Sequence, residues 1–135
     1  MISREDFLSI PKVAKEIQDE ENRIAVMRSK LYSPRGLDTS DKVQSSGSQT
    51  ALADIVIDME QKLEARETEL ERLQVQAQEL IQGSELLDGD TIVLMLLRYT
   101  ANARWSDIAE TMHYGIATIY RMHSSAIDIL FGDMK

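Results

Sequence analysis

An apolar stripe between Gln49 and about Gln82 constrains the fold of this chain more than any other feature of its sequence. Apolar residues recur there at alternating spacings of four and three, interrupted only at Arg66. The stripe consists of Leu52, Val56, Met59, Leu63, Leu70, Leu73, Ala77 and Leu80. A mean spacing of 3.5 residues is typical of a helix that packs along another helix. The pattern predicts a helix of about 33 residues, roughly 50 Å long, that stops at Gly83 and Ser84 and needs a partner for its stripe.

A shorter stripe in the N-terminal segment, from about Ser3 to Tyr32, is the nearest partner. Its apolar members are Ile10, Val13, Ile17, Ile24, Met27 and Leu31, with Glu20 at the missing position. We expect Ser9 to be the N-cap of this helix and Pro11 to lie in its first turn. The two stripes together predict a long antiparallel helical hairpin that resembles a coiled coil.

The register of this hairpin brings the two polar interruptions close together. If Leu31 lies opposite Leu52, Glu20 faces Leu63 and lies one turn from Arg66. Two interpretations stay open: both residues face solvent, or they form an inter-helix ion pair that sets the register. The second stripe is also longer than the first, so its apolar surface from Leu73 to Leu80 must be covered by the C-terminal part or by a second chain. This excess favours a homodimer.

A break in composition separates the two stripes. Residues 33–48, with the sequence SPRGLDTSDKVQSSGS, combine Pro, Gly, Asp and Ser, which favour turns over helix or strand. We expect them to form a partly mobile linker, because 16 residues are many for a connection inside a compact domain. The predicted domains are therefore a hairpin domain over 1–84 and a second domain over 85–135.

The heptad spacing ends before the last 50 residues, which read as three short helices. Residues 91–100 are apolar nearly all round and predict a buried helix preceded by a turn at Asp88. Residues 104–112 form a short amphipathic pattern, His113 to Gly115 a turn, and residues 116–131 a final helix. The fold class expected is all-α: the long hairpin followed by a three-helix bundle.

The last two of these helices have the spacing of a helix-turn-helix motif. Such a motif needs a small residue within its first helix, and Ala109 supplies it. It needs a turn residue that tolerates a positive φ four positions later, where His113 lies. Apolar residues ten and thirteen positions after the alanine, Ile119 and Met122, then seal the second helix against the first.

The string RYT…WSDIAETMHYGIATIYRMHSSAIDIL resembles the C-terminal helix-turn-helix region of bacterial sigma factors. It is most similar to the small late-transcription regulators of phages and prophages of the ArpU/RinA type. The match is carried by Leu94, Leu97, Arg98, Tyr99, Trp105, Ile108, Ala109, Ile119, Tyr120, Arg121, His123, Ala126, Ile127 and Leu130. The chain departs from these relatives at His113 and Gly115, where they usually carry Gly and Ser.

The resemblance implies that helix 116–131 enters the major groove of promoter DNA while another surface contacts RNA polymerase. The residues expected to contact double-stranded DNA are Gly115, Ile116, Ala117, Thr118, Tyr120, Arg121, Ser124, Ser125 and Arg104. A single arginine in the helix is a small set for reading bases.

Three further residues of the matching string carry open alternatives. Tyr120 either packs on a helix edge or stacks on a base. His123 either caps or lies half exposed, or contacts phosphate. Arg98 either pairs with Asp107 or Asp128, or reaches phosphate.

The charge of the chain is unevenly distributed. The net charge is −8 at pH 7. Residues 1–90 contain 11 Lys and Arg against 19 Asp and Glu, whereas residues 91–135 contain four of each sign. An acidic segment is repelled by DNA. We therefore expect the hairpin to contact protein, either polymerase or a second copy.

The sequence contains no signature of an enzyme. It lacks cysteine, its two histidines are ten residues apart without a metal-binding spacing, and no Gly-rich phosphate loop is present. We expect no cofactor and no metal. Without a signal peptide or an apolar run that could cross a membrane, a cytoplasmic location is expected. The sequence thus predicts a DNA-binding transcriptional regulator; the alternative is a helical interaction or assembly protein whose C-terminal bundle does not bind DNA.

Overall fold

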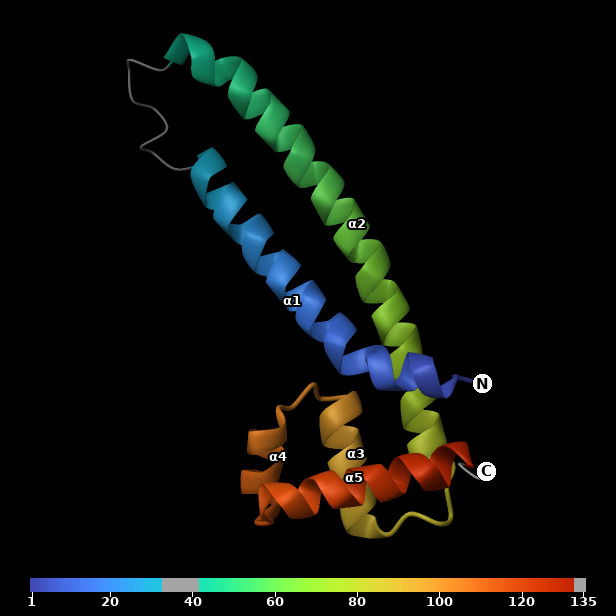
Figure 1. Ribbon diagram of the computed structural model, residues 1–135. Coiled ribbons are helices and arrows are strands. Elements are labelled where there is room, and N and C mark those ends of the chain that lie inside the picture. The colour runs from blue at the N-terminus through green and yellow to red at the C-terminus, as the bar shows by residue number, and fades with distance from the viewer. Residues whose placement is uncertain (33–41, 133–135) are drawn as a thin grey trace. The chain divides into compact units, whose positions relative to one another are not determined.

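The computed structural model describes residues 1–32 and 42–132, with side chains for residues 1–31 and 50–132. This described part is all-helical and contains no strand (Figure 1), as the sequence predicts. Its helices are α1 (Arg4–Tyr32), α2 (Lys42–Gly83), α3 (Gly89–Tyr99), α4 (Trp105–Met112) and α5 (Ile116–Phe131). Among the helices of the described ranges, none combines the length and the apolar character that crossing a bilayer requires.

Helix α1 begins earlier than the predicted cap at Ser9. The N-cap contact is made by Ser3, whose Oγ accepts a hydrogen bond from the Asp6 amide at 3.1 Å. Ser9 instead donates from its Oγ to the Asp6 carbonyl at 2.7 Å, inside the helix. Pro11 consequently lies well within α1 and not in its first turn. The early start brings Phe7 into the core, where it is 0% exposed, and this burial offsets the hydrogen bond that Pro11 cannot donate.

Helix α2 also begins earlier than predicted, at Lys42 instead of Gln49. Residues 42–48 of the predicted linker are therefore helical, while residues 33–41 of it lie outside the described residues. The reason is cooperativity: once a long helix is nucleated, adding a residue costs little. Gly47 weakens a helix by about 1 kcal/mol without breaking it.

The chain divides into two compact units, one of residues 1–14 with 70–135 and one of residues 15–69. The first unit therefore includes both ends of the predicted hairpin domain. Phe7 accounts for part of this difference, because its ring lies 4.2 Å from that of Tyr99 and 5.3 Å from that of Phe131, centroid to centroid.

In the unit of residues 15–69, α1 and α2 run side by side in opposite directions (Figure 1). Ile17 and Ile24 of α1 and Val56 and Leu63 of α2 are buried there. They are spaced by seven residues on each helix, as a heptad stripe requires.

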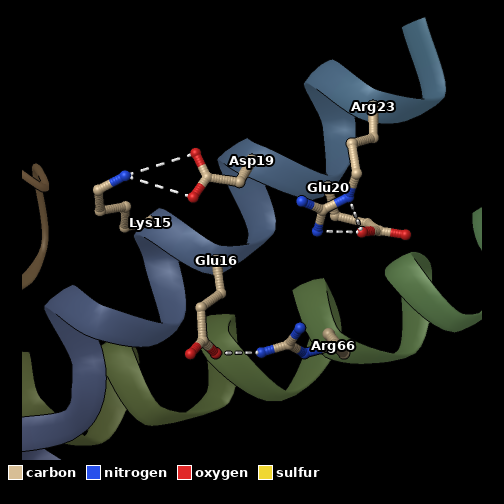
Figure 2. Close-up of polar contacts among 6 residues, drawn as sticks. All are labelled: Lys15, Glu16, Asp19, Glu20, Arg23 and Arg66. Atoms are coloured by element: carbon tan, nitrogen blue, oxygen red, sulfur yellow. Dashed lines mark hydrogen bonds and ion pairs between the residues drawn. The ribbon is translucent and has the colours of Figure 1, made fainter. Parts of the chain in front are cut away.

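An ion pair joins the two helices of this unit, with a partner that differs from the predicted one. Arg66 donates from Nη2 to Glu16 Oε1 at 2.8 Å (Figure 2). Glu20 accepts from Nε of Arg23 on its own helix at 2.9 Å. A second inter-helix pair joins Arg28 to Glu60. Arg66 thus reaches the glutamate one turn before the interruption in the first stripe.

In the unit of residues 1–14 and 70–135, the end of α2 is buried by the rest of the same unit. Ala77 and Ile81 are fully buried and Leu73 nearly so, and Gln74 Nε2 donates to Asn102 Oδ1 at 3.0 Å. The apolar surface near Leu73 to Leu80 is therefore covered within one chain. It no longer provides a reason for a second chain.

Helices α3, α4 and α5 of this unit pack on one another, with α5 lying across the other two (Figure 1). Asp88 is the N-cap of α3, since its Oδ1 accepts from the Thr91 amide at 2.8 Å. Helix α3 therefore begins at Gly89, two residues before the predicted start at residue 91. The bounds of α5 are those predicted, and α4 starts one residue later, with Arg104 as its N-cap.

Candidate nucleic-acid interface

The connection between α4 and α5 contains a residue in the left-handed region. His113 has φ 63° and ψ 36° and ends α4, which matches the sequence requirement for a residue there that tolerates positive φ. The Tyr114 amide donates back to the Ala109 carbonyl at 3.1 Å. Ile108 of α4 and Ile119 of α5 are both 0% exposed. The tight connection therefore holds the two helices together through one apolar face of each.

The opposite side of α5 is open to solvent. Of the nine residues predicted to contact DNA, Thr118 is half-buried and the other eight are exposed. Eight of the nine belong to α5 or its N-cap Gly115, whose missing side chain leaves the first amides of α5 without a side-chain cap. Ile116 and Tyr120 are 41% and 49% exposed, so this surface is partly apolar. Arg104 lies apart from them at the start of α4, paired with Asp107 at 3.2 Å.

The charge on this surface is small and mixed. Arg121 donates from Nη2 to Thr118 Oγ1 at 3.1 Å and has no carboxylate partner among the described residues. Tyr114 donates to Asp90 Oδ2 at 2.6 Å, and the pKa of the Tyr114 hydroxyl is raised because this carboxylate holds its proton. The turn therefore holds the negative charge of Asp90 through Tyr114, while α5 contributes the positive charge of Arg121.

Behind this surface lies a cluster of aromatic rings around His123. Tyr99 Oη and His123 Nε2 share a hydrogen bond of 2.6 Å. The Trp105 ring meets His123 edge-on, with the ring centroids 4.8 Å apart, and meets Tyr120 in the same way at 5.4 Å. Tyr120 thus packs on a helix edge while half of it remains exposed.

Arg98 lies in the same cluster and makes neither of its predicted contacts with Asp107 or Asp128. Its guanidinium carbon lies 4.2 Å from the centroid of the Trp105 ring, and Nη1 donates to the Ala103 carbonyl at 3.1 Å. A cation over a tryptophan face is stabilised by the ring quadrupole, which explains why Arg98 remains near the aromatic rings. Arg98, Tyr99, Trp105, Tyr120 and His123 are members of the matching string, so much of that string describes packing.

Burial changes the protonation of this cluster. It lowers the pKa of His123 to about 4, with the positive charge of Arg98 as a second cause. Burial likewise raises the pKa of Tyr99 to about 12. Both side chains are therefore uncharged at neutral pH, and their hydrogen bond joins two neutral groups.

Sequence reasoning missed two features of this unit. The first is Phe7, whose position three residues before Ile10 continues the N-terminal stripe and could have revealed it. The second is a groove of about 410 Å³ next to α5. It is lined by Leu86, Leu87, Asp88, Thr91, Arg121, Met122, Ser125, Ala126 and Ile129. No periodicity marks the residues before α3, so no local signal predicts this groove.

Comparison of the chain with protein-family models, with curated proteins and with solved structures finds no match.

Proposed function

We propose that this chain is a non-enzymatic DNA-binding transcriptional regulator, in which α4, the turn and α5 act as a helix-turn-helix and α5 enters the major groove. The observation that supports this most is the turn at His113 between two helices sealed by Ile108 and Ile119. It leaves one face of the N-terminal half of α5 exposed, as a helix that reads base edges requires.

The proposed mode of binding is weak and needs help from a protein. Arg121 is the one cation of α5, and Arg98 is held by Trp105 and the Ala103 carbonyl. Few phosphates can be neutralised by such a surface. In this proposal RNA polymerase supplies the remaining affinity, and the antiparallel hairpin of α1 and α2 is the arm that contacts protein.

Selection of duplexes from a random DNA pool tests the proposal, followed by anisotropy titrations on the enriched duplex. Arg121→Ala is expected to weaken binding by about 5- to 150-fold, equivalent to about 1–3 kcal/mol. Arg23→Ala is the matched control, because Arg23 is also an exposed arginine bonded to a residue three positions earlier. It should bind like the unaltered protein. Failure to enrich any duplex at low salt contradicts the proposal.

A second candidate function, a helical interaction or assembly protein, is favoured by the chemistry around α5. The Asp90 carboxylate accepts from Tyr114 of the turn and the Asp107 carboxylate pairs with Arg104, and both repel phosphate. Ile116 and Tyr120 offer exposed apolar area, which suits a protein partner. The same selection of DNA duplexes distinguishes the two candidate functions, because an assembly protein enriches no duplex. Its fold should also be unchanged by Arg121→Ala.

A further inference from the structure

The groove beside α5 has an apolar floor and an exposed leucine at its rim. Leu87 and Ala126 are buried at the floor, and Met122 and Ile129 line it from α5. Leu86 belongs to the same lining but is 76% exposed. Covering so much exposed apolar surface of a leucine with another apolar surface lowers the free energy.

The charges at the groove are unequally satisfied. Asp88 already accepts the Thr91 amide as the N-cap of α3. Arg121, which lines the groove, donates to the Thr118 hydroxyl and to no other group in the part of the chain that the structure describes. An occupant that places a carboxylate near Arg121 therefore meets a guanidinium with unused donors, and this is the geometry in which arginine binds acidic groups well.

The chain itself carries the matching pair of groups beside the groove. Glu85 directly precedes Leu86, is exposed, and has no hydrogen bond or ion pair within the described part of the chain. We propose that the groove is a self-association surface, in which Leu86 of each copy enters the groove of the other and Glu85 of each copy pairs with Arg121 of the other.

A dimer with a two-fold axis fills the grooves of both copies at once. In an interface of this symmetry the same patch contacts itself, so a residue that donates to the other copy also receives the equivalent contact. Because anchor and groove are adjacent in one molecule, one such axis buries both Leu86 side chains and forms both ion pairs. An unrelated partner would need to supply an apolar anchor beside a carboxylate, which this chain already has.

The inference is separate from the proposed DNA binding. A guanidinium that pairs with Glu85 is not available to phosphate, so the two uses of Arg121 exclude each other within one molecule. Self-association is measured on the full chain without DNA, so its failure is distinguishable from a failure of DNA binding.

Sedimentation velocity between about 10 and about 500 µM protein tests the proposal, at roughly 0.15 M salt so that the net charge is screened. The unaltered chain is expected to move from monomer to dimer across this range. Leu86→Glu should raise the dissociation constant at least about tenfold. Leu8→Glu, a charge placed on another exposed leucine of the same unit, should not change it. Circular dichroism of each variant verifies that it is folded.

Charge reversal makes the test specific to the named pair. Glu85→Arg and Arg121→Glu should each weaken the dimer at least about tenfold, and the double variant should return to within about threefold of the unaltered chain. A chain that stays monomeric over the whole range overturns the proposal. So does association that Leu86→Glu leaves unchanged, or a double variant no tighter than its single variants.

Discussion

Ile119 and Arg121 are two positions apart on α5, and their environments are opposite. Ile119 is fully buried, whereas Arg121 is exposed and, among the described residues, bonded to Thr118 alone. Ile119→Ala leaves a cavity and is expected to cost about 2–4 kcal/mol of unfolding free energy. Arg121→Ala should change it by less than about 0.5 kcal/mol. Urea unfolding of both variants checks this, and an equal loss in the two would mean that Arg121 has a structural partner.

His123 makes stability depend on pH at the residue scale. Its pKa is about 4 in the folded chain, against an ordinary value of 6.5, so the unfolded chain binds the proton more readily between these values. The contribution of His123 to the free energy of unfolding is therefore fully present above pH 6.5 and is lost as the pH falls toward 4.

The melting temperature of the unaltered chain should fall more steeply from pH 6.5 to 4 than that of His123→Gln. His113→Asn serves as the control, because Asn tolerates the positive φ at this exposed position and should retain the steep dependence. Equal slopes for the unaltered chain and His123→Gln would contradict the burial of His123 among Tyr99, Trp105 and Arg98.

Between helices α1 and α2, two glutamates of the hairpin have opposite roles. Glu16 pairs with Arg66 at 2.8 Å. The pKa of Glu67 is raised, chiefly by a hydrogen bond with the carboxyl of Glu21 across the hairpin. Because its pKa is raised in the folded chain, Glu67 contributes to the stability of the fold below the ordinary value of 4.5. It loses that contribution as the pH rises through the folded-state pKa.

At pH 7, Glu67→Gln should therefore raise the melting temperature of the chain slightly, because it removes a negative charge and keeps a donor for Glu21. Glu16→Gln should lower it, although an exposed pair contributes at most about 1 kcal/mol. Scanning calorimetry compares the two variants. Changes of the same sign would show that net charge alone governs the hairpin.

At the scale of the whole molecule, residues 85–135 are not expected to fold by themselves. Their unit also contains residues 1–14 and 70–84, and the core includes Phe7, Ala77 and Ile81, all fully buried. A fragment of residues 85–135 should show little helix by circular dichroism, because its core loses these side chains. Cooperative melting of the fragment would contradict this expectation.

The salt dependence of DNA binding also belongs to the whole molecule. With Arg98 held inside the aromatic cluster, Arg104 and Arg121 are the exposed cations of residues 91–132. Counterion release by two cations then gives a slope of log affinity against log salt of about −2. Anisotropy titrations at several salt concentrations measure it. A slope as steep as that of a strongly basic repressor would mean that residues 1–90 also contact the DNA.

The sequence by itself determined the helical character of the chain and the connection between α4 and α5, because these depend on groups close together along the chain, whereas it placed the starts of α1 and α2 too late. The bounds of α5 and the left-handed His113 follow from spacings of a few residues. The buried positions Ile108 and Ile119 follow from the same local pattern.

Only the tertiary structure decided which distant groups meet. It placed Phe7 against Tyr99, moved Arg98 onto Trp105, and gave Arg66 the partner Glu16. The first two contacts join residues of different helices, which no sequence pattern relates. In the third, Arg66 bonds Glu16 and not Glu20, which lies one turn further along α1. These contacts form because apolar side chains are buried and charges are paired, and both effects depend on the packing of the whole unit.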